Sequence, residues 1–114
     1  MRTLLLMLLL SSTCFAGERE EVERLAPGYN AITEFRLWDA SRVDMINDEY
    51  AIEVDWAYKW AEGVGQCLYY AEMTGRKPAL LLLIKDDKQV KYIFRAHMVC
   101  AKHGIKLYLE KTKP

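Results

Sequence analysis

The hydrophobic pattern of the first half predicts one short helix followed by three strands. The stretch "GEREEVERLA" carries Val22 and Leu25 on one side and ends before "PG", as a short helix would. β-Branched and aromatic residues then dominate three runs, which the turn signals "DAS" and "NDE" separate: 33–38, 42–46 and 50–56. Such runs predict a three-stranded antiparallel meander.

The second half alternates between helical and strand patterns. In "YKWAEGVGQCLYYAEMTG", the apolar residues that recur at helical spacing are Trp60, Val64, Cys67 or Leu68, and Ala71. The continuous run "PALLLLIK" predicts a strand covered on both faces. A second amphipathic helix lies in "DDKQVKYIFRAHMVCAKHG", with a predicted core stripe of Val90, Ile93 or Phe94, His97, and Cys100 or Ala101. "IKLYLE" is a last strand, so we expect an α/β fold with a mixed sheet flanked by helices in the order α-β-β-β-α-β-α-β.

Three acidic residues interrupt the apolar strands of the meander. Alternation along a strand puts Glu53 and Asp55 on one face. A two-residue turn at 48–49 would place Asp44 opposite Glu53 and Arg42 opposite Asp55. Two opposed carboxylates repel each other, and a hard divalent cation such as Mg²⁺ would compensate for that repulsion. The alternative is a salt-bridge network in which Asp44 pairs with Arg42 or Arg36.

The helix that follows adds a second group of polar residues. Lys59, Gln66 and Tyr70 are seven and four residues apart, which aligns them along one helix edge beside the apolar stripe. This helix starts where the acid-bearing strand ends. We therefore expect a cation, an amide and a phenol near the carboxylates, where Lys59 and Gln66 could contact phosphate and Tyr70 could stack or donate a hydrogen bond. The alternative is a solvated helix edge.

Length and charge narrow the interpretation. The chain has 114 residues, with 16 basic and 16 acidic side chains, which suits one domain with a single modest core. Zero net charge removes the simplest argument for nucleic-acid binding, although a local basic groove would still allow it.

The N-terminus has the pattern of a secretory signal peptide. "MRTLLLMLLLSSTCFA" combines one Arg, a short apolar run and a cleavage position after Ala16. We predict a signal peptide over 1–16, a mature domain over 17–114, and a periplasmic or secreted location without a membrane span. A lipoprotein anchored through Cys14 is the weaker alternative, because Ser11 and Thr13 depart from the usual lipidation signal. Cys67 and Cys100 would remain, as two buried thiols or as a disulfide if both helices lie on one side of the sheet.

Together these residues resemble the PD-(D/E)XK nuclease superfamily, whose restriction-endonuclease-like core has the order α-β-β-β-α-β. Asp44 in "RVD" takes the place of the motif Asp, and Glu53 in "EVD" that of the motif Glu. "GQCLYY" resembles the Gln-x-x-x-Tyr helix motif of the RecB-like branch, with Gln66 and Tyr70 in register. The combination also resembles small exported bacterial proteins of unassigned activity within this superfamily. The resemblance covers about residues 18–110.

One position departs from the family pattern. The motif lysine, two residues after the Glu, is Asp55 here. Lys59 is the best substitute and Lys85 the second. The resemblance also implies a further glutamate, for which the candidates are Glu34 on the first strand and Glu20, Glu21 or Glu23 on the first helix. Glu34 reaches the face of Asp44 only if the first hairpin has a three-residue loop.

Two functions of different classes follow from the resemblance. In the first, the protein is a phosphodiesterase acting on DNA, in which Asp44 and Glu53 hold Mg²⁺ or Mn²⁺, with catalytic roles for Asp55 and Lys59. Gln66, Tyr70 and Arg42 would then contact the substrate, and a homodimer could be needed to hold a duplex. In the second, it is a catalytically silent module of the same fold that binds nucleic acid or a protein partner in the cell envelope.

Overall fold

The computed structural model describes residues 17–113, so the predicted signal peptide and Cys14 lie outside the described residues. Residues 17–25 are helical and lead into the 3₁₀ turn η1. The remaining helices and strands are β1 (Ile32–Arg36), β2 (Arg42–Ile46), β3 (Tyr50–Trp56), α2 (Trp60–Thr74), β4 (Lys77–Ile84), α3 (Val90–Lys102) and β5 (Lys106–Lys111). This confirms the predicted element order, and the bounds of β2 and β3 are those expected from the sequence.

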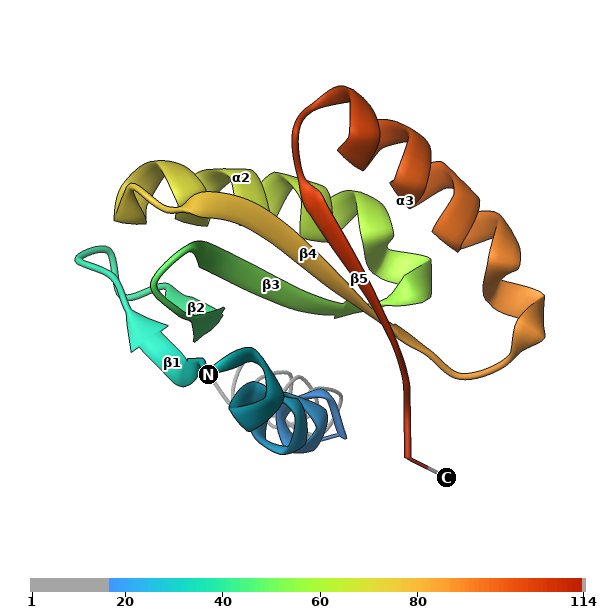
Figure 1. Ribbon diagram of the computed structural model, residues 1–114, viewed down its shortest axis with the longest axis horizontal. Coiled ribbons are helices and arrows are strands. Elements are labelled where there is room, and N and C mark those ends of the chain that lie inside the picture. Colours follow the sequence, from blue (N-terminus) through green and yellow to red (C-terminus); the bar gives the residue numbers. More distant parts are fainter. Residues whose placement is uncertain (1–16, 114) are drawn as a thin grey trace, which may run out of the picture.

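The five strands form one mixed sheet in the order β1-β2-β3-β4-β5 (Figure 1). β1, β2 and β3 make the antiparallel meander, whereas β4 and β5 both run parallel to β3. Parallel neighbours need a crossover connection, and α2 and α3 provide it. The protein is therefore an α/β domain in which helices flank a mixed sheet.

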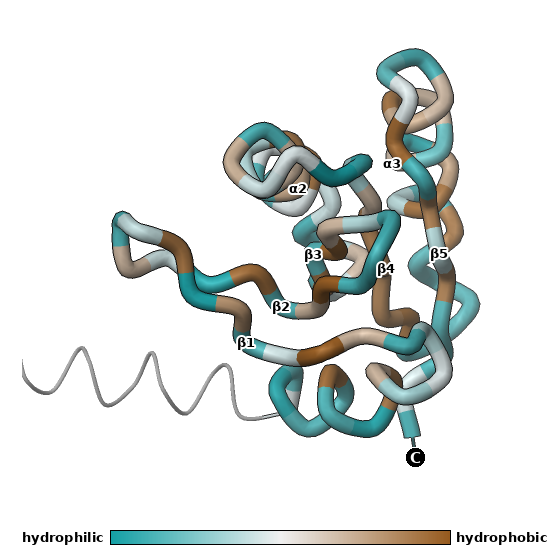
Figure 2. The backbone as a smooth tube through the Cα atoms, turned by 60° about the vertical axis from the view of Figure 1, so that its left-hand side comes forward, coloured by the Kyte–Doolittle hydropathy of each residue, from teal (hydrophilic) through white to brown (hydrophobic). Residues whose placement is uncertain are grey.

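The two faces of the sheet are covered by different helices. Ile52 and Val54 pack with Val22 of the helix over 17–25, whereas Leu80 and Leu82 pack under α2 and α3. Figure 2 shows α2 and α3 on one side of the sheet and the first helix on the other. The interior strand β4 is accordingly buried on both faces, as its continuous apolar run predicts. No helix within residues 17–113 is long and apolar enough to cross a membrane.

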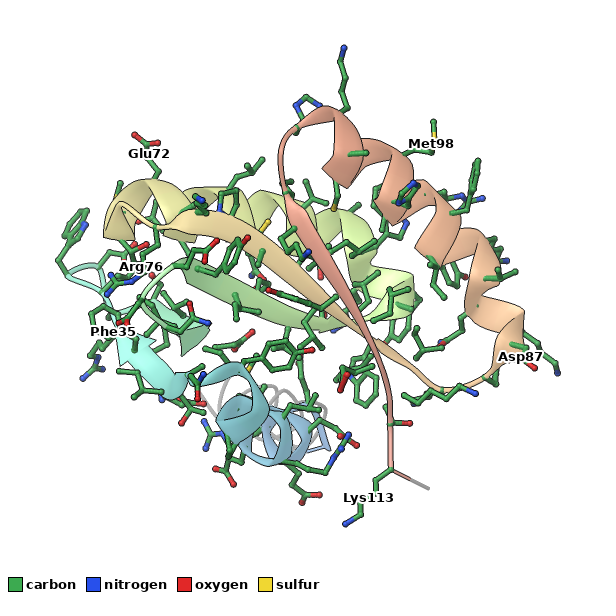
Figure 3. The ribbon with its side chains drawn as sticks, viewed as in Figure 1. Phe35, Glu72, Arg76, Asp87, Met98 and Lys113 are labelled. Atoms are coloured by element: carbon green, nitrogen blue, oxygen red, sulfur yellow. The ribbon has the colours of Figure 1, made fainter. Side chains whose placement is uncertain are left out.

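The predicted core stripe of α3 is confirmed at Cys100 but is wrong at Val90, Phe94 and His97. The side chains that α3 buries are Ala96 and Cys100, whereas Val90 and Phe94 are 66% and 65% exposed and His97 is exposed as well. Small residues on the inner edge let the helix approach the sheet and α2 closely, which a stripe containing Phe94 would not. Met98, on the outer side, points away from the fold (Figure 3).

Candidate functional site

The β2–β3 hairpin has the register that the sequence predicts. Asn47 N–H donates to the Tyr50 carbonyl at 3.1 Å, which closes a two-residue turn. Met45 and Ile52 are paired, and the same register puts Asp44 opposite Glu53. The ladder loosens there, because the Val54 N–H donates to Asp44 Oδ2 at 2.8 Å instead of to a main-chain carbonyl. The two acids of the predicted pair therefore face each other across β2 and β3.

Burial dominates the electrostatics of this pair. Glu53 is 4% exposed, and burial raises its pKa well above the ordinary range, with the hydrogen bond that it donates to Asp44 and the charges of Asp44 and Asp55 adding to the shift. Burial also raises the pKa of Asp44, although its hydrogen bonds with Glu53 and the Val54 N–H oppose the shift. Glu53 is therefore the member of the pair that holds a proton, and Asp44 is the acceptor.

In the register of β1 and β2, Glu34 lies opposite Asp44. Asp44 thus has Glu34 on one neighbouring strand and Glu53 on the other. The β1–β2 hairpin closes with three residues, 38–40, between Leu37 and Ser41, whose backbones are joined by a 2.8 Å hydrogen bond. This is the loop length that the placement of Glu34 required. Glu34 adopts a left-handed backbone conformation with φ of 57° within the strand, an uncommon and strained state for a residue with a side chain.

The charge of Glu34 is compensated by arginines. It pairs with Arg42 at 2.9 Å and with Arg19 at 3.4 Å. The alternative in which Arg42 pairs with Asp44 or Asp55 is thus not realised. Arg42 is outside the lining of the main pocket, so its predicted contact with the substrate stays a prediction for a substrate that extends beyond that pocket.

α2 brings the predicted amide and phenol against the carboxylates. Gln66 and Tyr70 line the same pocket as Asp44 and Glu53, as does Lys59 from the 3₁₀ turn before α2. The pocket has a volume of about 530 Å³, and its full lining is Glu18, Asp44, Glu53, Asp55, Lys59, Glu62, Gly65, Gln66 and Tyr70. Six residues that the sequence selected, from four separate elements, thus converge on one cavity.

Gly63 allows α2 to approach the strands so closely. A Cβ atom at this position would lie 2.6 Å from Leu80 Cδ1 and 3.5 Å from Asp55 Oδ2. Only a residue without a side chain fits there, so the helix backbone packs directly over Asp55.

Lys59 acts electrostatically on Asp55 and Glu18. Burial raises the pKa of Asp55 to about 7 and that of Glu18 to about 8, and in both cases the positive charge of Lys59 opposes the shift. The other candidate, Lys85, is exposed, and its ammonium lies 4.6 Å from the ring centroid of Trp56, outside the pocket lining. Of the two lysines that the sequence offered, Lys59 is the one at the site.

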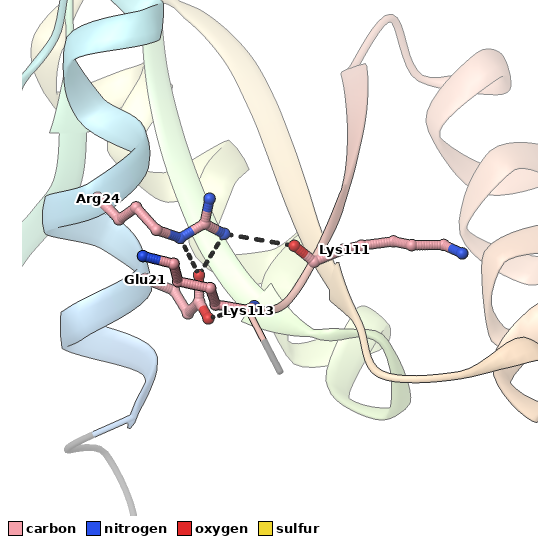
Figure 4. Close-up of polar contacts among 4 residues, drawn as sticks. All are labelled: Glu21, Arg24, Lys111 and Lys113. Carbon is pink, nitrogen blue, oxygen red and sulfur yellow. Dashed lines mark hydrogen bonds and ion pairs between the residues drawn. The ribbon is translucent and has the colours of Figure 1, made fainter.

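Glu18 is the pocket residue of the first helix, which the sequence analysis missed. The candidate Glu21 instead points toward the C-terminal segment (Figure 4), where it accepts hydrogen bonds from Arg24 Nε at 2.8 Å and from the Lys113 N–H at 3.1 Å. Glu20 and Glu23 are exposed. Glu18 precedes the buried Val22 by four residues, so it shares the inward edge of the helix, and this spacing was the signal that could have identified it.

The donor set suits a hard divalent cation bound through two carboxylates. The carboxyl groups of the half-buried Asp44 and the buried Glu53 have raised pKa values, and an open cavity beside them has room for water and phosphate. Mg²⁺ is commonly held by one or two carboxylates, waters and substrate phosphates rather than by a full protein cage. No group of three or more His, Cys, Asp or Glu side chains within 17–113 is arranged to hold a metal, so a cation here would depend on such additional ligands.

Cys67 and Cys100 are free thiols in the structure, both buried in the core under α2 and α3. The two helices do lie on one side of the sheet, which the predicted disulfide required, but the bond is not formed. Burial raises the pKa of Cys67 to about 12, so its thiol stays protonated.

Comparisons with protein-family models, curated proteins and solved structures found no significant match to this chain.

Proposed function

We propose that the protein is a metal-dependent phosphodiesterase of the PD-(D/E)XK type that cleaves DNA with Mg²⁺ or Mn²⁺. The observation that carries this proposal is the convergence of Asp44 and Glu53 with Lys59, Gln66 and Tyr70 in one cavity. The element order supports a restriction-endonuclease-like core, since the antiparallel meander is followed by a helix and a strand parallel to β3. The first 16 residues support export to the periplasm or the medium.

Asp44 and Glu53 would hold the metal. A bound Mg²⁺ or Mn²⁺ would polarise the phosphoryl oxygen and lower the pKa of a water molecule. For this the proton of Glu53 must leave, because only the ionised carboxylate is a ligand. The raised pKa of Glu53 therefore makes metal loading dependent on pH.

The remaining pocket residues would position the phosphodiester. Burial and the nearby carboxylates raise the pKa of Tyr70 to about 12, so its hydroxyl keeps its proton at neutral pH and can donate to a phosphate oxygen. The Gln66 amide can donate beside it. Lys59 supplies positive charge beside Asp55 and Glu18, and we assign to it the role of the motif lysine, which offsets negative charge on the phosphate.

Replacing Glu53 tests the proposal. We expect the protein over 17–114 to cleave plasmid or linear DNA with Mg²⁺ or Mn²⁺, and Glu53→Gln to lose this activity. Gln preserves the shape and a hydrogen-bond donor of the protonated acid, so the variant should fold. The matched control is Glu72→Ala, since Glu72 is an exposed acid on α2 that points into solvent (Figure 3). Full activity of Glu53→Gln would refute the assignment.

A silent module of this fold is the second candidate. Two observations favour it: Asp55 stands where the motif has lysine, and residues 17–113 contain no ready group of three metal ligands. Calorimetric titration with Mg²⁺ separates the two functions. Binding that disappears in Glu53→Gln supports the enzyme, whereas no binding at millimolar metal supports the module.

A further inference from the structure

The tip of the β1–β2 hairpin exposes a large aromatic side chain. Trp38 is 85% exposed and belongs to the three-residue loop between Leu37 and Ser41. Ala40, in the same loop, has a left-handed φ of 70° and donates its N–H to the Leu37 carbonyl at 3.1 Å. Figure 2 shows this hairpin reaching away from the rest of the sheet. Both faces of an indole with this exposure are open to a planar group such as a nucleic-acid base.

The loop is fixed in place over α2. Asp39 accepts hydrogen bonds from the Ser41 N–H at 3.0 Å and from the hydroxyl of Tyr69. These hydrogen bonds lower the pKa of Asp39, so the carboxylate stays ionised and the contact persists at neutral pH. Tyr69 is the neighbour of the pocket residue Tyr70, and the hairpin tip lies beside the C-terminal half of α2 (Figure 1). Trp38 therefore stands at the margin of the candidate site.

Two arginines lie on the strands at the base of this loop. Arg36 and Arg42 are paired across β1 and β2 and are both exposed, although like charges at such positions repel each other. The main pocket, in contrast, is lined by five carboxyl groups and a single lysine. A polyanionic substrate would find little positive charge inside the pocket. The hairpin provides positive charge through Arg36 and through Arg42, although Arg42 also pairs with Glu34 at 2.9 Å.

We propose that this hairpin holds a single-stranded segment of nucleic acid, with Trp38 stacked on an unpaired base and Arg36 and Arg42 on adjacent phosphates. The inference rests on the proposed function, because it takes the strand in the pocket to be nucleic acid. Base stacking on aromatic side chains combined with a cationic track is the general chemistry by which proteins bind single strands. The bases of a duplex are already stacked on one another, so the hairpin favours a single strand or a frayed end.

Binding without metal tests this inference apart from cleavage. We would measure the fluorescence anisotropy of a labelled single-stranded oligonucleotide in EDTA, at several salt concentrations. Trp38→Ala should weaken binding at least about tenfold, as loss of one stacked base would, and Trp38→Phe should retain most of the affinity. Phe94→Ala is the matched control, because Phe94 is 65% exposed on α3, and it should bind as the wild type does. Arg36→Gln should reduce the slope of log K against log salt by about 0.7.

Several outcomes would overturn the proposal. These are an affinity of Trp38→Ala equal to that of the wild type, an equal loss in Phe94→Ala, or tighter binding of a blunt duplex than of the single strand. Loss of binding to anionic lipid vesicles in Trp38→Ala, with oligonucleotide binding unchanged, would identify the tip as a membrane contact instead. A protein that binds the oligonucleotide through Trp38 but never cleaves it would keep this inference and refute only the nuclease.

Discussion

Asp44 and Asp55 of the pocket differ in the neighbouring groups that set their hydrogen bonding and their charge. Asp44 accepts the Val54 N–H at 2.8 Å and a hydrogen bond from Glu53, so it is the better acceptor of the pair. Asp55 accepts the N–H of the following Trp56 at 3.1 Å and is held against Lys59 by charge. The same residue type therefore accepts hydrogen bonds in one place and pairs with a positive charge in another.

Lys59 should be the lysine on which cleavage depends. We expect Lys59→Ala to lower kcat/KM at least about tenfold, about 1.4 kcal/mol of transition-state stabilisation, because Asp55 and Glu18 would keep uncompensated charge beside the phosphate. Lys85→Ala is the control, since Lys85 lies over Trp56 outside the pocket. Steady-state kinetics of both variants, with circular dichroism to verify the fold, decide the point. Equal activities of the two variants would mean that Lys59 is only a surface charge.

At the scale of elements, the close packing of α2 on the sheet depends on Gly63. A Cβ atom there would come within 2.6 Å of Leu80 Cδ1, so Gly63→Ala should push the helix outward and destabilise the fold by about 1–3 kcal/mol, the usual cost of overpacking. Gly65→Ala is the control on the same helix, because nothing lies within 4 Å of its added Cβ. Helix propensity should make that variant more stable by up to about 1 kcal/mol.

Urea unfolding at equilibrium measures both glycine variants. Opposite signs of the change in unfolding free energy are expected. If both variants were stabilised alike, α2 would not be packed against Asp55 as the structure has it.

The hairpins could be predicted because short turns fix strand register. A two-residue turn leaves one pairing between Asp44 and Glu53, and the alternation of β3 settles which residues face the pocket. The stripe of α3 could not be predicted in the same way. Two neighbouring edges of that helix fit a period of 3.6, and only the space under the helix selects Ala96 and Cys100 over Phe94.

Glu18 escaped prediction for a related reason. The first helix carries several glutamates, and local sequence does not say which one meets the strands and which meets a distant segment. The pairing of Glu21 with Arg24 and Lys113 depends on the tertiary fold.

For the whole molecule, the buried acids make metal-free stability depend on pH. Asp55 and Glu18 have folded pKa values of about 7 and about 8, above their ordinary values of 3.8 and 4.5. Between those limits the folded state binds more protons than the unfolded state, so stability is fully present at low pH and is lost as the pH rises through the folded values. In EDTA we expect a lower melting temperature at about pH 8 than at about pH 5.

Two comparisons identify which groups cause the pH dependence of the melting temperature. The double variant Glu18→Gln with Asp55→Asn should show a flatter melting profile, because two of the titrating groups are gone. Added Mg²⁺ should raise the melting temperature of the wild type most at high pH, where ligands are ionised and binding to the folded state is strongest. A wild-type profile that does not fall between about pH 5 and about pH 8 would contradict the raised pKa values.

The contacts of Glu21 and Arg24 with the C-terminal segment affect the order in which the fold and its pocket form. Arg24 and Glu21 meet the backbone of Lys111 and Lys113, which follow them by 87 and 92 positions (Figure 4). During synthesis the first helix leaves the ribosome long before these partners exist, and contacts so distant in sequence form late in folding. The same helix carries Glu18 into the pocket. A nascent chain thus holds an incomplete site, and the full set of carboxyl groups comes together only when the first helix and the C-terminal segment have made contact.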